Sequence, residues 1–173
     1  MQEHGLKISE LVTLFNLEVL NRGSDYDTAL LTITDVNRPG LQFHSFYDYF
    51  DPRRLQVLGK AEITYLKGLT TEQRRKCFDD LFLYDIPALV ISRGLDCFPE
   101  CLESARVHER TLLRTEETTV EFTSHTIEYL NRVLAPCVTR HGVLLDISGE
   151  GVMITGDSGI CLLYTSDAAD DMQ

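Results

Sequence analysis

A glycine-rich turn follows an apolar run near the C-terminal end of the sequence. Residues Val152–Ile154 lead into the turn Thr155, Gly156, Asp157, Ser158, Gly159 and Ile160. Backbone N–H groups in such a turn can hold a phosphate at the positive end of a following helix. The turn is therefore the first half of a candidate phosphate loop, and an ordinary glycine turn is the alternative.

The second half of this loop does not match the pattern. A phosphate loop has the form G-x-x-x-x-G-K-[ST], so counting from Gly156 it needs glycine, lysine and a hydroxyl residue at 161, 162 and 163. The sequence has Cys161, Leu162 and Leu163 there. The lysine that would add charge beside the phosphates and the hydroxyl that would bind magnesium are both replaced by apolar side chains.

A histidine precedes the strand pair that ends in this turn. His141 stands directly before Gly142 and the apolar run that follows it. Imidazole changes its charge near neutral pH and can exchange protons with a substrate. A lone histidine is usually structural or solvated, but its position ahead of a strand pair that ends in this turn makes His141 a candidate site residue.

Three other groups of residues could bind a ligand, but a structural interpretation is favoured for each. Cys97 and Cys101 lack a second ligand pair, so two buried or half-buried thiols are expected rather than a metal site. Arg93 follows a predicted strand and could bind an anion, although a surface turn is favoured. A solvated surface explains the loop aspartates at least as well as a calcium site does: Asp25, Asp27, Asp48 and Asp51.

The composition excludes several classes of protein. Of 173 residues, 16 are basic and 27 acidic, which gives a formal charge of −11 and disfavours nucleic acid or an anionic membrane as a partner. No apolar stretch reaches the ~18–20 residues of a membrane span. The first residues show no signal-peptide pattern, and five scattered cysteines do not form a disulfide framework. We therefore expect a cytoplasmic protein.

Strand and helix patterns alternate over most of the chain. Helices are predicted on the apolar face that begins at Ile8, after Thr70 with its capping partner Gln73, after Pro99, and around Ile127–Leu134. Short apolar runs between them predict strands: LEVL, ALLTI, RLQVLG, IPALVIS and TLLR. Residues 35–54 are expected to be irregular. This alternation predicts an α/β domain over residues 1–130.

The pattern changes after Pro136. Residues 140–156 contain two apolar strands around the turn Ser148-Gly149-Glu150-Gly151, which predicts a β-hairpin. We therefore expect three segments: the α/β domain at 1–130, the start of a second and incomplete domain at 131–160, and a tail at 161–173.

Several separated segments resemble one known family, in the same order. The segments ISELVTLFNLEVLN, ITDVNRPGLQ, RLQVLGKAEITYL, YDIPALVISRGL and RHGVLLDISGEGVMITGDSGI are similar to the N-terminal part of bacterial HPr kinase/phosphorylase. The resemblance runs from about residue 8 to Ile160. The remaining residues, CLLYTSDAADDMQ, look like foreign sequence joined to a truncated gene fragment, and a divergent natural C-terminus is the alternative.

This resemblance implies a fold, an activity and partners. The N-terminal α/β domain would resemble the first domain of cell-wall precursor ligases, and the hairpin would be the first of a P-loop kinase domain. The family is cytoplasmic and assembles as a homohexamer through its kinase domain. It uses ATP and magnesium to phosphorylate a regulatory serine of the phosphocarrier HPr, and it reverses this by phosphorolysis, which controls carbon catabolite repression and sugar uptake.

The resemblance also assigns roles to individual residues. The family's catalytic histidine falls on His141, and its phosphate loop falls on Gly156, Asp157, Ser158, Gly159 and Ile160. Its loop lysine and magnesium-binding serine fall on Leu162 and Leu163, and its later aspartate, glutamate and arginine have no counterpart. Two hypotheses follow. The chain is a fragment of this protein serine kinase/phosphorylase that is itself inactive, binds no cofactor and forms no hexamer, or it is a non-catalytic α/β binding or regulatory module.

Overall fold

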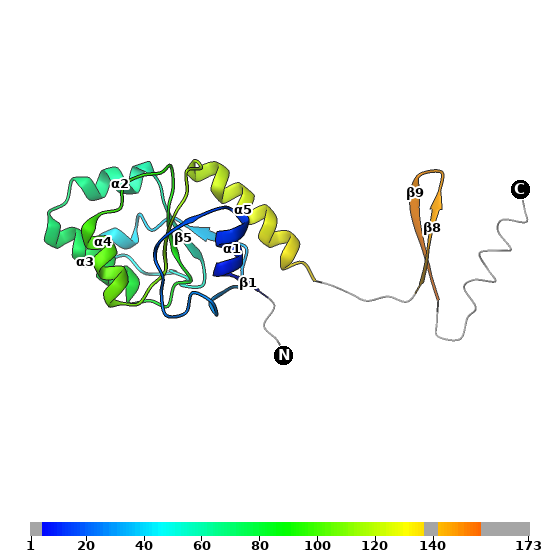
Figure 1. Cartoon of the computed structure of the whole chain (residues 1–173), viewed down its shortest axis with the longest axis horizontal. Helices are drawn as coiled ribbons and strands as arrows, with labels where there is room; N and C mark the ends of the chain where they lie inside the picture. Colours follow the sequence, from blue (N-terminus) through cyan, green and yellow to red (C-terminus); the bar gives the residue numbers. More distant parts are fainter. Residues whose placement is uncertain (1–4, 137–141, 157–173) are drawn as a thin grey trace, which may run out of the picture. The chain divides into compact units, whose positions relative to one another are not determined.

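The computed structural model describes residues 5–136 and 142–156 of the chain. The chain divides into two compact units, Met1–Ala135 and Pro136–Gln173 (Figure 1). The first unit is an α/β domain, and the second contains a β-hairpin. Within the described residues, no helix is both long and apolar enough to cross a membrane.

A five-stranded mixed sheet forms the centre of the first unit. Its order is β2-β7-β6-β5-β4, in which β4 (Val36–Asn37), β5 (Leu55–Leu58), β6 (Leu89–Ile91) and β7 (Leu112–Arg114) are parallel. The edge strand β2 (Glu18–Asn21) pairs antiparallel with β7. All residues of β5 and β6 are buried, as expected for parallel strands covered on both faces.

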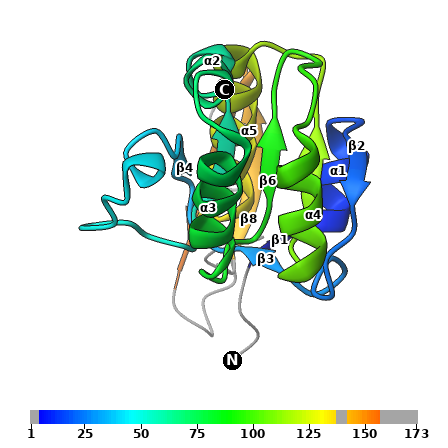
Figure 2. The ribbon, with the colours of Figure 1, turned by 90° about the vertical axis from the view of Figure 1, so that its left-hand side faces the viewer.

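Helices cover both faces of this sheet. One face packs against η1 (Gln42–His44), α2 (Lys60–Lys67), α3 (Thr71–Phe82) and α4 (Pro99–Val107), and the other against α1 (Ile8–Leu14) and α5 (Thr119–Val133). Figure 2 shows α3 and α4 in front of β6, with α5 behind it. Successive strand residues alternate between the two cores: Leu89 and Ile91 belong to the first, and Val90 to the second. The domain is therefore a three-layer α/β sandwich.

Two short strands and one extra helix complete the domain. β1 (Leu6–Lys7) pairs antiparallel with β3 (Leu30–Leu31), so the predicted strand ALLTI is shorter than expected. Helix α2 was not expected from the sequence. It begins after Gly59, whose N–H donates to Glu62 Oε2 at 2.9 Å, so the glutamate supplies the N3 half of a capping box and the glycine supplies no side-chain acceptor.

The predicted helix starts at Thr70 and Pro99 are confirmed. Thr70 and Gln73 form the expected capping box, and Pro99 occupies the first turn of α4. A second capping box joins Thr118 and Glu121, so α5 begins eight residues before the predicted Ile127 and ends at Val133. Residues 35–54 are mostly irregular, as predicted, apart from β4 and the 3₁₀ turn η1.

Candidate functional site

The predicted hairpin forms in the second unit. Strands β8 (Gly142–Ile147) and β9 (Glu150–Thr155) pair antiparallel along their whole length. The turn is tighter than the sequence predicts, because Glu150 and Gly151 belong to β9. Ser148 and Gly149 have φ values of 57° and 88°, as a two-residue type I′ turn requires, and the Gly149 N–H donates to Asp146 Oδ1 at 2.8 Å.

The open end of the hairpin is the part nearest in sequence to the predicted phosphate site. Gly142 pairs with Thr155, so the residue after His141 lies opposite the residue before Gly156. A Cβ at position 142 would stand 2.5 Å from the Ile154 carbonyl oxygen, so this close pairing requires glycine. Gly156 follows the end of β9. His141 and the loop residues Asp157, Ser158, Gly159 and Ile160 lie outside the described residues.

The backbone of the loop after β6 agrees with the surface turn that was favoured for Arg93. Arg93 and Gly94 have left-handed φ values of 65° and 57°, which turn their N–H groups toward the loop after β7. The Arg93 N–H donates to the Glu117 carbonyl and the Gly94 N–H to the Thr115 carbonyl, both at 2.8 Å. Because these donors are already satisfied, the favoured surface turn fits better than a phosphate cradle.

Buried hydroxyl groups lie at the carboxyl ends of β5 and β6, next to this loop. Ser92 Oγ donates to the Leu58 carbonyl at 2.9 Å and lies 2.7 Å from Thr119 Oγ1. A Cβ on Gly59 would meet that Thr119 oxygen at 2.6 Å. The carboxyl ends of β5 and β6, where α/β proteins usually bind ligands, are therefore filled by the domain's own side chains.

The cysteine pair behaves as the structural interpretation predicted. Cys101 is fully buried in the α4 core and Cys97 is half-buried beside that core. A hydrogen bond with the Cys101 thiol lowers the pKa of Cys97, whereas burial raises the pKa of Cys101. Across the described ranges, no group of three or more His, Cys, Asp and Glu side chains could hold a metal ion.

The loop aspartates do not converge on a calcium site. Asp27 forms an ion pair with Arg22 at 2.6 Å, and Asp51 forms one with Arg53 at 2.7 Å. Asp25 is the exception, because its Oδ1 is buried without a partner and burial raises its pKa. These separate contacts agree with the surface interpretation of Asp27 and Asp51.

One pocket was missed by the sequence analysis. It lies between η1, α2 and α3, and Lys76 and Asp80 line it together with Ser45 and Tyr65. Its one signal in the sequence is the spacing of Lys76 and Asp80, which are four residues apart and therefore share a helix face. Its other side comes from residues expected to be irregular and from a helix that was not predicted.

Comparisons with known proteins place this α/β domain in a family. The family model described as HPr Serine kinase N terminus matches residues 6–130. An HPr kinase/phosphorylase of Alkaliphilus metalliredigens is 44% identical over 155 residues, which cover 90% of this chain and 50% of that protein. One from Clostridium beijerinckii is 43% identical over 156 residues, covering 90% and 51%. The chain belongs to the HPr kinase/phosphorylase family, and it spans about half the length of the curated relatives it matches.

A solved structure shares the fold. The crystal structure of the CBS and DRTGG domains of the regulatory region of Clostridium perfringens pyrophosphatase, complexed with the activator diadenosine tetraphosphate, has a TM-score of 0.53. The match covers 96% of this chain and 60% of that chain at 12% identity, so it concerns the fold alone. The α/β class is thereby confirmed, and the likeness to cell-wall precursor ligases stays a prediction.

Proposed function

We propose that this chain carries the N-terminal part of an HPr kinase/phosphorylase. The whole protein would phosphorylate a regulatory serine of HPr with ATP and remove that phosphate by phosphorolysis, controlling carbon catabolite repression and sugar uptake. One observation of the structure supports this in particular. The pairing of Gly142 with Thr155 brings together the two chain positions that flank the predicted catalytic histidine and phosphate loop.

The residues that follow Ile160 lack the side chains that would bind ATP and magnesium. Phosphoryl transfer depends on positioning and on charge stabilisation by a lysine and a metal ion. Leu162 and Leu163 stand where the lysine and the magnesium hydroxyl are required, and an apolar side chain supplies neither charge nor ligand. We therefore propose that a polypeptide of these 173 residues is inactive, although its family is enzymatic.

Location and assembly belong to the same proposal. The family resemblance implies a cytoplasmic protein and a homohexamer assembled through the kinase domain. The hairpin β8–β9 is the described part of that domain here, and we do not expect it to support a hexamer alone. Light scattering on the 173-residue polypeptide tests this, and six chains per particle would contradict it.

A second function is favoured by the closed core of the first unit. Both faces of its sheet are covered by its own helices, with buried cores on each side. Such a domain can fold without a catalytic partner. A non-catalytic binding or regulatory module is therefore the alternative for this polypeptide.

The sequence of the parent gene beyond residue 160 separates the two proposals. If the chain comes from an HPr kinase/phosphorylase, codons for Gly-Lys-Ser should follow Ile160 in the genome. A genomic copy that continues with Cys-Leu-Leu would contradict the enzymatic proposal and favour the module.

A further inference from the structure

The pocket between η1, α2 and α3 is small and lined by polar groups around an apolar patch. Its volume is about 180 Å³. Phe43, Leu69 and Cys77 supply apolar lining, and Ser45, Gln73 and Lys76 contribute hydrogen-bond donors. This volume is below that of pockets for drug-sized ligands, which span roughly 300–1,000 Å³. The pocket therefore suits a very small ligand.

Core packing and hydrogen bonds fix the walls of this pocket. Phe43 is buried and packs edge-on against Phe78, with 5.8 Å between the ring centroids. The Cys77 thiol donates to the Phe43 carbonyl at 3.4 Å, which ties α3 to η1. Tyr65 Oη lies 3.3 Å from His44 Nδ1, which ties α2 to the same turn. The pocket is therefore preorganised by the fold.

Lys76 and Asp80 bring opposite charges to the pocket without neutralising each other. They lie four residues apart on α3, a spacing at which opposite charges often pair. Among the described residues, neither side chain forms an ion pair or a hydrogen bond. The order of lysine before the acid is the weaker one for such a pair, because it opposes the helix dipole. Both charges are therefore available to a ligand.

The surroundings of Asp80 strengthen its effect on a bound cation. Burial, and then the Asp80 charge, raise the pKa of the neighbouring Tyr47. The Tyr47 hydroxyl is buried without a hydrogen-bond partner. Asp80 is itself half-buried, and charge interactions near a protein surface are stronger than in bulk water.

We propose that this pocket binds a small zwitterion of the α-amino-acid class. The ligand carboxylate would pair with the Lys76 ammonium and the ligand ammonium with the Asp80 carboxylate, while a short side chain lies on the apolar lining. An anion would be repelled by Asp80 and a cation by Lys76, so only a molecule that carries both charges satisfies both side chains. This proposal is independent of the proposed phosphoryl transfer.

Three isosteric probes test the proposal: L-alanine, L-alaninamide and L-lactate. The first carries both charges, the second only the positive charge, and the third only the negative charge. Each is titrated into the ¹⁵N-labelled 173-residue chain while the amide signals of Ser45, Lys76 and Asp80 are followed. We expect L-alanine to bind at least about tenfold more tightly than either analogue, a difference of about 1.4 kcal/mol. Equal affinity of the three probes, or no change in these signals, would overturn the proposal.

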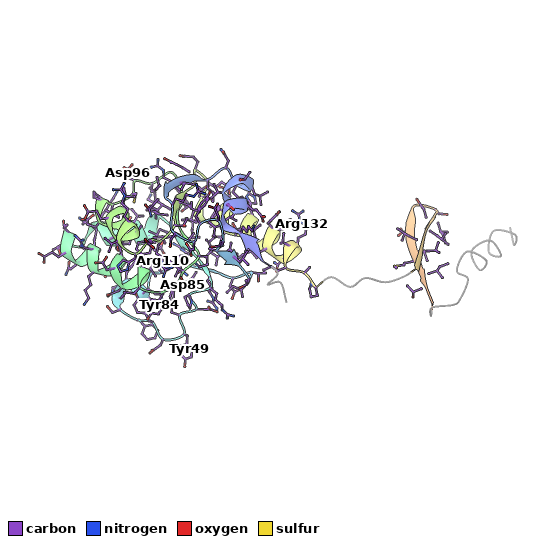
Figure 3. The ribbon with its side chains drawn as sticks, turned by 60° about the horizontal axis from the view of Figure 1, so that its bottom comes forward. Tyr49, Tyr84, Asp85, Asp96, Arg110 and Arg132 are labelled. Carbon is purple, nitrogen blue, oxygen red and sulfur yellow. The ribbon has the colours of Figure 1, made fainter. Side chains whose placement is uncertain are left out.

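Matched variants assign the two charges. Lys76→Met should remove the preference for L-alanine over L-alaninamide, and Asp80→Asn should remove the preference over L-lactate. Lys67→Met and Asp96→Asn change exposed charges that do not line the pocket, and they should leave binding unchanged (Asp96 is labelled in Figure 3). Unchanged thermal unfolding of all four variants shows that they fold. Retention of both preferences in folded Lys76→Met and Asp80→Asn proteins would also overturn the proposal.

Discussion

Arg74 of α3 and Glu100 of α4 form a largely buried ion pair. Arg74 Nη2 and Nε donate to the same Glu100 oxygen, Oε1, at 2.7 Å and 3.2 Å, and their side chains are only 16% and 9% exposed. Arg74 Nη1 also donates to the Leu69 carbonyl at 2.7 Å. One side chain therefore joins the two helices to the turn that lines the small pocket.

Replacing Arg74 should destabilise the domain strongly. Arg74→Met leaves the Glu100 carboxylate buried without its partner, which typically costs about 3–5 kcal/mol of unfolding free energy. Urea denaturation measures the loss. Arg75→Met is the control, because the Arg75 side chain is 53% exposed and should change stability by less than about 0.5 kcal/mol. Equal stability of the two variants would show that the pair contributes little.

The same pair makes stability depend on pH. The hydrogen bond from Arg74 lowers the pKa of Glu100 below its ordinary 4.5. The native state therefore binds this proton less readily, and the stabilisation is present above pH 4.5 and is lost as pH falls through the lowered value. Glu100→Gln should cost about 2 kcal/mol at pH 7, with the difference from the unmodified chain shrinking below pH 4.5. A difference that stays constant across this range would contradict the assignment.

Gly23 should not tolerate even one added methyl group. A Cβ there would stand 2.5 Å from the Glu109 carbonyl oxygen and 2.8 Å from the Thr111 nitrogen, which are backbone atoms that cannot rotate away. Gly23→Ala should cost about 1–3 kcal/mol through overpacking. A Cβ on Gly40 would have no neighbour within 4 Å, so Gly40→Ala is the matched control. Thermal unfolding compares the two, and equal melting temperatures would refute the predicted clash.

Hydrogen exchange should distinguish the two units. The first has two buried cores, whereas the hairpin exposes its large apolar side chains, including Leu144 at 74% and Ile147 at 54%. An isolated two-stranded hairpin is marginally stable in water. We expect strong protection of β5 and β6 amides and rapid exchange in β8 and β9. Equal protection of the two sets would count against this description.

Helices and strands were predicted correctly where the sequence carries one strong local signal, such as a capping pair or an uninterrupted apolar run. The Thr70 and Gln73 capping pair marks the start of α3, and the uninterrupted apolar run of β6 predicts a strand buried on both faces. Helix α2 was not predicted because its N-cap is Gly59, which has no side chain to signal a helix start. Its capping partner Glu62 accepts a hydrogen bond from the Gly59 backbone N–H, a contact that any residue at position 59 except proline could make. The early start of α5 was missed although Thr118 and Glu121 carry the capping signal.

Sites proved harder to predict than elements because they depend on where backbone groups point. Ser92-Arg93-Gly94 follows a parallel strand, as a ligand loop would, yet the N–H groups of Arg93 and Gly94 donate to the next loop and that of Ser92 to the Leu58 carbonyl. Conversely, Lys76 and Asp80 occupy an ordinary exposed helix face in the sequence, and only tertiary packing of η1 and α2 places them beside a pocket. The predictions at His141 and Asp157–Ile160 lie outside the described residues, so they rest on the family resemblance.

The most direct test of the central claim is a transfer assay with radiolabelled ATP and purified HPr. The chain as printed is compared with its triple variant Cys161→Gly, Leu162→Lys, Leu163→Ser and with the full-length HPr kinase/phosphorylase of Clostridium perfringens as a positive control. We predict serine phosphorylation of HPr by the control enzyme alone, because the restored lysine and serine supply only part of the charge stabilisation that transfer needs. Phosphorylation of HPr by the chain as printed would contradict the account, since Leu162 and Leu163 would then stand in a working site.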